Sequence, residues 1–229
     1  MIDPEPAPLA SQYRFAPARL TQKGALRVYE DHSPGAQAVT ITFQYNPEAV
    51  RRTLAMRTPP AEGAKARGAP QDVFRASGPP VENITLSVEL DAADQPSQQS
   101  NQGKGLLPVL AQLELLLYPS SARIRDAENA ASQGSAHANP TQVPLIVLVL
   151  GANRVLPVLL TNFSIAEEHF DTFYNPIQAK VEFGFRVLTT MEMGDQSAGT
   201  DAYRAYHSSK EQLSQQGAQA GVPASGGST

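Results

Sequence analysis

Between residues 143 and 188 the sequence holds three apolar segments in a row, and this stretch constrains the fold more than any other. In the third segment, apolar and polar residues alternate from Ile177 to Leu188, and successive side chains of a β-strand point to opposite faces of its sheet. We therefore expect a strand with one buried face and one face that meets water or a partner. The first segment, Pro144–Leu150, is apolar throughout, which is typical of a strand covered on both faces; a membrane span needs roughly 20 apolar residues.

Earlier segments carry the same strand pattern. From Val39 to Tyr45, β-branched and aromatic residues occupy every second position, and the pattern stops at Asn46-Pro47 because proline has no N–H for a strand ladder. Apolar and polar residues alternate again from Ile84 to Asp91, and Leu26–Tyr29 has the composition of a further short strand. Together with the three later segments, these predict a mainly β fold.

One segment has a clear helical period. Large apolar residues recur every three or four positions between Leu106 and Leu117, as on one face of an amphipathic helix, and Tyr118-Pro119 ends the pattern. A chain of 229 residues, 41% of them hydrophobic, suits one sizeable core. We expect a mainly β domain over residues 23–192 with one prominent helix near 106–118 and long loops at 54–80, 94–105 and 120–141, preceded by an N-terminal arm (1–22) and followed by a short helix near 202–213 and a disordered C-terminal tail within 193–229.

Composition excludes several classes of function. The chain has no cysteine, so it has neither disulfides nor thiolate nucleophiles. Its net charge is −4 and it has no long basic run, which argues against nucleic-acid binding. One patch is locally basic, and in the preferred interpretation it belongs to a solvated loop, with an anionic partner as the alternative; it comprises Arg51, Arg52, Arg57, Lys65 and Arg67. The N-terminus has neither the basic nor the apolar region of a secretory signal, so we expect assembly in the cytoplasm and no membrane insertion.

A search for catalytic chemistry finds one weak candidate. Glu167, Glu168, His169 and Asp171 resemble an acid/base or metal cluster, but neighbouring residues point in different directions and a second histidine at helical spacing is missing. A polar loop is the preferred interpretation, and a site is the alternative. Gly103-Lys104-Gly105 lacks the upstream glycine and following Ser or Thr of a phosphate-binding loop. We therefore predict no enzyme activity, no catalytic residues, no metal and no cofactor.

Several motifs, taken in order, resemble one protein family. The motifs are Phe43–Pro47, Arg51–Thr53, Gly78–Asp91, Leu107–Pro119, Asn162–Ile165, Phe170-Asp171 and Asn175–Val181. Each motif alone is weak, and the ordered set is fairly specific. Over roughly residues 23–190 the set resembles the tube-like adaptor domain of contractile injection systems, which belongs to a phage-tail-like baseplate.

The resemblance implies a fold, partners and a location. The fold would be a β-barrel or sandwich related to inner-tube proteins. Copies would form a ring, a hexamer in the family, that contacts the spike hub, the inner-tube initiator and sheath-side baseplate proteins, in a particle that is released or docked at a membrane. Many relatives continue into a LysM module, whereas the residues after Leu188 show no second domain-sized apolar pattern, so a pure adaptor is expected. The alternatives are a tube-initiating or tube-forming ring subunit of the same machine and, from another class, a hydrolase or carbohydrate-binding module.

The contact surface of such a ring is predicted from two features. The first is the tripeptide Tyr-Asn-Pro, which occurs twice and is interpreted as shared turn chemistry rather than duplication. The second is the polar face of the third apolar segment, where we expect reversal of the charges of Lys180 and Arg186 together to leave the monomer folded and to impair assembly. The candidate interface residues are Tyr45, Asn46, Pro47, Arg51, Arg52, Tyr174, Asn175, Pro176, Lys180 and Arg186.

Overall fold

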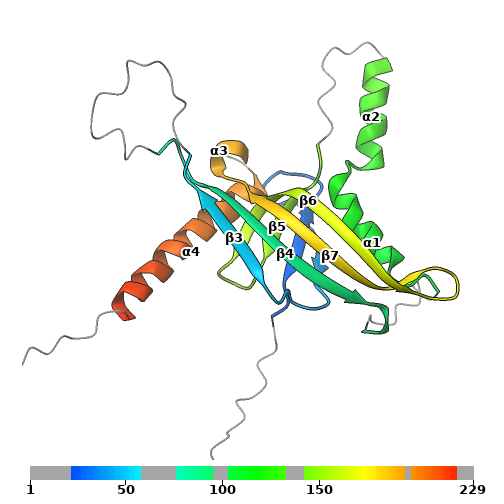
Figure 1. The fold of residues 1–229 in the computed structure, drawn as a ribbon. Coiled ribbons are helices and arrows are strands. Elements are labelled where there is room, and N and C mark those ends of the chain that lie inside the picture. Colours follow the sequence, from blue (N-terminus) through cyan, green and yellow to red (C-terminus); the bar gives the residue numbers. More distant parts are fainter. Residues whose placement is uncertain (1–21, 58–75, 95–102, 133–141, 194–196, 221–229) are drawn as a thin grey trace, which may run out of the picture.

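A seven-stranded antiparallel sheet forms the centre of the computed structural model (Figure 1). The strand order is β2-β1-β5-β6-β7-β4-β3, so β6 and β7 lie near the middle and β2 and β3 lie at the edges. The structure describes residues 22–57, 76–94, 103–132, 142–193 and 197–220. The strands are β1 (Ala25–Tyr29), β2 (Val39–Thr42), β3 (Val50–Ala55), β4 (Val81–Asp91), β5 (Leu145–Val149), β6 (Val155–Phe170) and β7 (Pro176–Val187).

Helices flank the sheet, and most of them are short. The helix predicted from the leucine pattern is present as α1 and continues into the 3-10 turn η5. A second helix, α2, occupies the first part of the segment expected to be a loop at 120–141; it extends away from the sheet and buries no side chain (Figure 1). The helical elements are η3 (Ala92–Asp94), α1 (Leu107–Glu114), η5 (Leu115–Leu117), α2 (Ser121–Ser132), α3 (Thr190–Met193) and α4 (Ala198–Ala220).

The sheet curls around a core rich in aromatic side chains. Phe183 on β7 stacks on Phe185 and on Phe43, which follows the edge strand β2, at ring-centroid distances of 5.4 and 6.3 Å. In Figure 1, β3, β4, β7 and β6 lie side by side in front, with β5 and the blue N-terminal strands behind them. The buried leucines of α1 and η5, such as Leu110 and Leu116, belong to the same core. Such interdigitation of apolar side chains stabilises the curled form.

Side-chain hydrogen bonds hold the curl across the sheet. The side chain of Gln44, just beyond β2, donates to the carbonyl oxygen of Asp91 at 2.7 Å and accepts from the Asp91 amide at 3.0 Å. Asp91 is the last residue of β4, which is next to the opposite edge in the strand order. A residue beyond one edge of the sheet therefore reaches the end of a strand near the other, without closing the hydrogen-bonded ladder.

The strand patterns are confirmed where the sequence alternates. In β7 the side chains of Val181, Phe183 and Phe185 are buried, whereas Lys180 and Glu182 are exposed. The first apolar segment is buried on both faces, as β5. A mainly β fold is thus correct. The N-terminal arm lies almost entirely, and the last nine residues of the predicted tail lie entirely, outside the described residues.

Three boundaries differ from the sequence prediction. Residues expected to begin a long loop instead end the edge strand β3, which pairs with β4 from Val50 to Ala55. The second core strand, β6, runs on to Phe170 rather than ending before Glu167. The short helix predicted near 202–213 is the 23-residue α4. In each case tertiary pairing or a side-chain network stabilises a segment whose own apolar pattern is weak.

Candidate functional site

The acidic and histidine cluster near residue 168 does not form an acid/base pair. Glu167 and Glu168 are consecutive residues of β6 that pair with Ala179 and Gln178, so their side chains point to opposite faces of the sheet. Asp171 is used by the turn that follows: its carboxylate accepts from the side chain and from the amide of Asn175, both at 2.8 Å, and these bonds hold its pKa below the usual range. Among the described residues, no group of three or more His, Asp or Glu side chains could hold a metal ion. The preferred interpretation as a polar loop is also wrong, since Glu167–His169 lie on a strand.

The first Tyr-Asn-Pro motif fastens the N-terminal strand to the sheet. The side-chain oxygen of Asn46 accepts from the Gly24 amide at 2.8 Å, and its amide group donates to the Gln22 carbonyl at 3.0 Å. The hydroxyl of Tyr45 donates a short hydrogen bond to Asp94, and this bond raises the pKa of Tyr45 to about 12. Asn46 therefore has an intramolecular role, whereas the Tyr45 ring stays partly exposed.

The second Tyr-Asn-Pro motif closes the β6–β7 hairpin and anchors α1. Asn175 donates to the Gly103 carbonyl at 3.1 Å, and the Pro176 carbonyl accepts from the Leu106 amide at 2.8 Å. Both motifs thus use asparagine to bind distant backbone groups, which agrees with shared turn chemistry. Tyr174 differs from the other two residues of the motif, Asn175 and Pro176: it is 79% exposed and its φ is 65°.

Arg52 joins the edge strand β3 to the C-terminal helix. Its guanidinium lies 2.6 Å from the carboxylate of Glu82, and Lys210 on α4 donates to the same carboxylate at 2.9 Å. The hydroxyl of Tyr206, also on α4, donates to Glu82 at 3.0 Å and accepts from Arg52 at 2.9 Å. Burial raises the pKa of the Glu82 carboxyl, but the hydrogen bonds from Lys210 and Arg52 outweigh it and hold that pKa below the ordinary value. Arg51, like Arg52, is exposed on the edge strand β3, so the solvated loop expected for these two arginines is a strand.

The two candidate cations of β7 have different surroundings. Arg186 forms a short ion pair with Glu192, whose carboxylate also lies 3.3 Å from Arg57. No ion pair is found for Lys180 among the residues that the structure describes. Lys180 lies on the exposed outer face between Glu89 of β4 and Ala166 of β6. Of the two, Lys180 is therefore the cation that remains available to a partner.

The outer face of β4 and β7 is hollowed beside Lys180. Two adjoining hollows of about 350 and 400 Å³ share Tyr45, Glu89 and Lys180 as lining residues. The structure thus brings together residues 45 and 180, which were predicted separately. Ser87 lines one of the hollows, and its hydroxyl is buried with no hydrogen-bond partner among the residues that the structure describes. This hollowed, polar surface is the candidate contact surface of the sheet.

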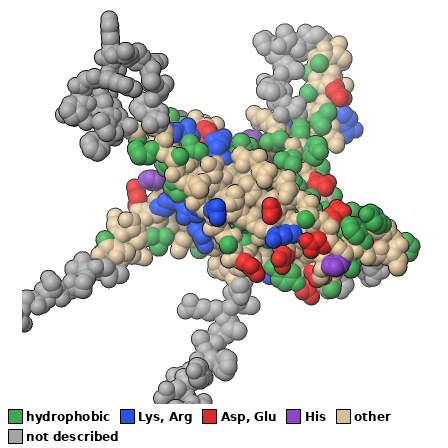
Figure 2. Space-filling view, in the orientation of Figure 1, with side chains coloured by type: hydrophobic (Ala, Val, Ile, Leu, Met, Phe, Trp, Pro, Cys, Tyr) green, Lys and Arg blue, Asp and Glu red, His purple; other side chains and the backbone are tan. Residues whose placement is uncertain are grey.

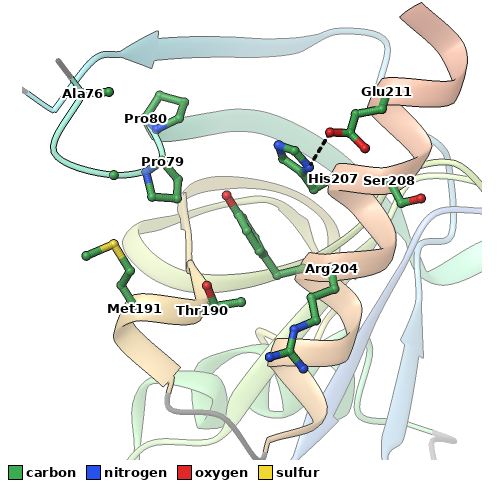
Figure 3. A pocket seen from close by; sticks show the side chains of 11 residues that line it. Ala76, Pro79, Pro80, Thr190, Met191, Arg204, His207, Ser208 and Glu211 are labelled. Carbon is green, nitrogen blue, oxygen red and sulfur yellow. Dashed lines mark ion pairs between the residues drawn. The ribbon is translucent and has the colours of Figure 1, made fainter. Parts of the chain in front are cut away.

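A larger groove, not predicted from the sequence, lies at the other end of the sheet. Its volume is about 890 Å³, and Figure 3 shows Pro79 and Pro80 on one side, facing residues of α4, with Met191 and Thr190 of the α3 region at its base. His207 lies along α4 with its ring 3.5 Å from Glu211. The apolar residues are scattered over three segments of the chain, which explains why no local pattern marked this groove.

Charge is distributed unevenly between the end of the sheet with the groove and the end with the β6–β7 hairpin. Figure 2 shows Lys and Arg side chains gathered near α4, whereas Asp and Glu side chains gather near the β6–β7 hairpin. The cations near α4 include Arg52, Arg57, Arg186, Arg204 and Lys210, and the carboxylates near the hairpin include Glu89, Asp91, Asp94, Glu167 and Glu168.

Comparison with known proteins adds no relative. No protein-family model matches the chain, and no curated protein matches it either. None of the helices in the described part of the chain is long and apolar enough to cross a membrane.

Proposed function

We propose that this chain is a structural adaptor in the baseplate of a contractile injection system. In this role, copies of the chain form a ring, a hexamer by the family resemblance, that links the spike hub and the inner tube to sheath-side components. The role requires surfaces for protein contacts and neither a cofactor nor a catalytic group. No observation in the described residues favours a hydrolase, because Glu167 and Glu168 point to opposite faces of the sheet and Asp171 is engaged in a turn.

The observation that carries the proposal is where the ordered motifs lie. Phe43 of the first motif packs on Phe183, the leucines of the helical motif enter the same core, and Asn175 of the last motif binds the segment before α1. Motifs that are far apart in the sequence thus contact the same core or connect neighbouring elements of one curled sheet. Residues that determine such contacts are the ones that proteins of the same fold have in common, and this supports a resemblance in fold.

The proposal includes a finer fold class, a barrel of the inner-tube type. The hydrogen bonds between Gln44 and Asp91 support it, because they join the end of β2 to the end of β4 across the open side of the sheet. A sheet that curls this far leaves β2 and β3 as edges, and edges with unpaired backbone groups are suited to strand contacts between neighbouring copies.

The test of the proposal is to locate the chain in an intact particle. Particles purified from cells that express the tagged chain are expected to contain it in the baseplate, at a copy number that matches a ring, by electron microscopy and native mass spectrometry. Particles that lack the chain in both tube and baseplate would overturn the proposal. If the purified chain polymerises by itself into long tubes, it is a tube subunit instead.

A substitution at Lys180 tests the contact surface within this proposal. We expect Lys180→Glu to leave the monomer folded, with a loss of stability below about 1 kcal/mol from the like charge of Glu89 opposite it, and to weaken ring formation. The Arg186→Glu change is a poor substitute because it also breaks the pair with Glu192 and lowers stability. Native mass spectrometry of the two variants, with thermal unfolding of each, separates the two effects. Normal rings from Lys180→Glu would remove this face from the contact.

A further inference from the structure

The tip of the β6–β7 hairpin is a rigid, exposed aromatic knob. Phe173 and Tyr174 are 82% and 79% exposed, and the Tyr174 ring stacks on Phe170 with centroids 4.5 Å apart and planes within 5°. Asp171 fixes the turn, because its carboxylate accepts from the amides of Phe173 and Asn175 at 2.8 Å. The knob is thus ordered before any partner arrives, so binding it loses little conformational entropy. Exposed aromatic side chains grouped in this way are typical of a protein-binding surface.

The groove beside α4 has the chemistry to receive this knob. Pro79, Met191 and Tyr203 give it apolar walls, and its volume of about 890 Å³ lies within the roughly 300–1,000 Å³ of ligand-sized pockets. Met191 is 66% exposed, so the groove is open to solvent. Methionine and tyrosine make favourable contacts with an inserted aromatic ring. Figure 3 shows that Arg204 extends from α4 beside the groove.

The two surfaces lie at opposite ends of the same strands. The hairpin tip precedes Pro176, where β7 begins, and the groove lies beyond Val187, where β7 ends. A strand of twelve residues spans about 40 Å at roughly 3.4 Å per residue, so the knob cannot reach the groove of its own chain. A contact between them joins two copies through different surfaces, and contacts of this type build rings when the rotation closes.

Charge favours the same pairing. The carboxylates of Glu167 and Glu168 lie on the strand that leads to the knob, and Asp91 and Asp94 lie nearby on the facing strand and its 3-10 turn. Among the described residues, the end with the groove carries more arginine and lysine than the hairpin end (Figure 2), although four of these cations also pair with Glu82 or Glu192 of the same chain. Complementary charge at the two ends orients approaching copies and disfavours contacts between like ends.

We propose that the aromatic knob of one copy, Phe173 and Tyr174, inserts into the groove of Pro79, Met191 and Tyr203 on a second copy of this chain. This inference rests on the proposed ring, for which it names the contact between neighbours. The rings of the knob would fill the space between the apolar walls of the groove, and the groove would bury the two rings that the hairpin exposes to water.

The absence of cysteine makes a direct test available, because each introduced thiol is unique. Two single variants beside the contact, Thr172→Cys next to the knob and Thr190→Cys at the groove, keep Phe173 and Met191 in place. They are purified, mixed and treated with a mild oxidant, and the disulfide between positions 172 and 190 is measured by mass spectrometry. The matched control replaces Thr190→Cys by Glu128→Cys, on the exposed helix α2. We expect at least a tenfold higher yield for the 172–190 pair than for the 172–128 pair. Equal yields would overturn the inference.

A second measurement does not depend on crosslinking. We expect Phe173→Asp to keep the thermal stability of the wild type, since the ring is exposed, and to weaken self-association by tenfold or more in analytical ultracentrifugation. Leu115→Asp, at an equally apolar exposed position on η5, is expected to associate normally. Rings that form normally with Phe173→Asp overturn the inference and leave the proposed function intact, whereas absence of the chain from the particle overturns the proposed function itself.

Discussion

Replacement of Glu82 by glutamine removes the charge that holds α4 to the sheet. Glu82 is only 4% exposed, and its carboxylate accepts from Arg52, Tyr206 and Lys210. Loss of one partner of a buried ion pair costs roughly 3–5 kcal/mol, because the other charge is left without compensation. The side chains of Arg52 and Lys210 are 32% and 38% exposed, so water recovers part of that cost. We expect Glu82→Gln to lower the free energy of unfolding by about 2–3 kcal/mol at pH 7.

Thermal and urea unfolding followed by circular dichroism measure this loss. A chain of this size loses roughly 2–4 °C of Tm for each kcal/mol, so Tm is expected to fall by about 5–10 °C. Glu89→Gln is the matched control, since Glu89 lies on the same strand with its side chain exposed; it is expected to change stability by less than about 0.5 kcal/mol. Hydrogen exchange in α4 is expected to accelerate in Glu82→Gln, because the carboxylate charge and one of its two acceptor oxygens are lost to the donors Arg52, Tyr206 and Lys210.

The dependence of stability on pH provides a second test of the role of Glu82. Since the pKa of Glu82 is lowered on folding, its contribution is fully present above its ordinary value of 4.5 and is lost as the pH falls through the lower folded-state value. The difference in stability between the wild type and Glu82→Gln should therefore shrink as the pH falls below about 4.5. A Glu82→Gln variant as stable as Glu89→Gln at pH 7, or a difference that grows in acid, would refute this account.

Three further predictions concern other joints of the fold. Gly105→Ala should lower the free energy of unfolding by about 2–4 kcal/mol, because φ is 53° and an added Cβ would overlap the Pro176 carbonyl oxygen. The control Gly103→Ala, where φ is 80° and the space around the Cβ is open, should cost only about 1 kcal/mol. Equal losses of the two variants in urea unfolding would contradict the overlap. Phe183→Ala should cost about 3–5 kcal/mol, since its ring contacts Phe43, Phe163 and Phe185, and a thermal shift no larger than that of an exposed-site control would speak against this aromatic core. Asp94→Asn should return the pKa of Tyr45 from about 12 toward 10, which ultraviolet titration detects as one tyrosine that ionises earlier; an unchanged titration would show that Asp94 does not hold that proton.

The sequence predicts those strands whose two faces differ in environment. The alternation in β4 and β7 identifies their buried faces, because one side of each meets the core and the other meets water. The edge strand β3 lacks this contrast: from Arg51 to Ala55 its side chains are exposed, so no apolar period marks it. The end of β6 is missed for the same reason, since the residues from Ala166 to Phe170 are exposed.

The role of Glu82 could have been predicted from the alternation itself. It shares its parity with Ile84 and Leu86, and so falls on the buried face of β4, where an unpaired carboxylate is costly. A carboxylate buried at that position must therefore form ion pairs with cations from elsewhere in the chain. Arg52 reaches Glu82 because β3 pairs with β4, and Lys210 reaches it because α4 packs on the sheet. No local sequence pattern predicts either of these contacts.

The strand order also determines when the fold can form during synthesis. The β1–β2 and β3–β4 hairpins are made first, but Leu26 of β1 pairs with Leu148, and Leu86 of β4 pairs with Phe183. The strands in the middle of the sheet, β5, β6 and β7, are therefore translated after the strands at its edges. Until these three strands leave the ribosome, one edge of each early hairpin has no strand to pair with. Pairings this distant in sequence fold slowly and expose aggregation-prone edges in the interval. The rate of translation over residues 145–187, rather than the stability of the finished sheet, is then expected to limit the yield of folded chain.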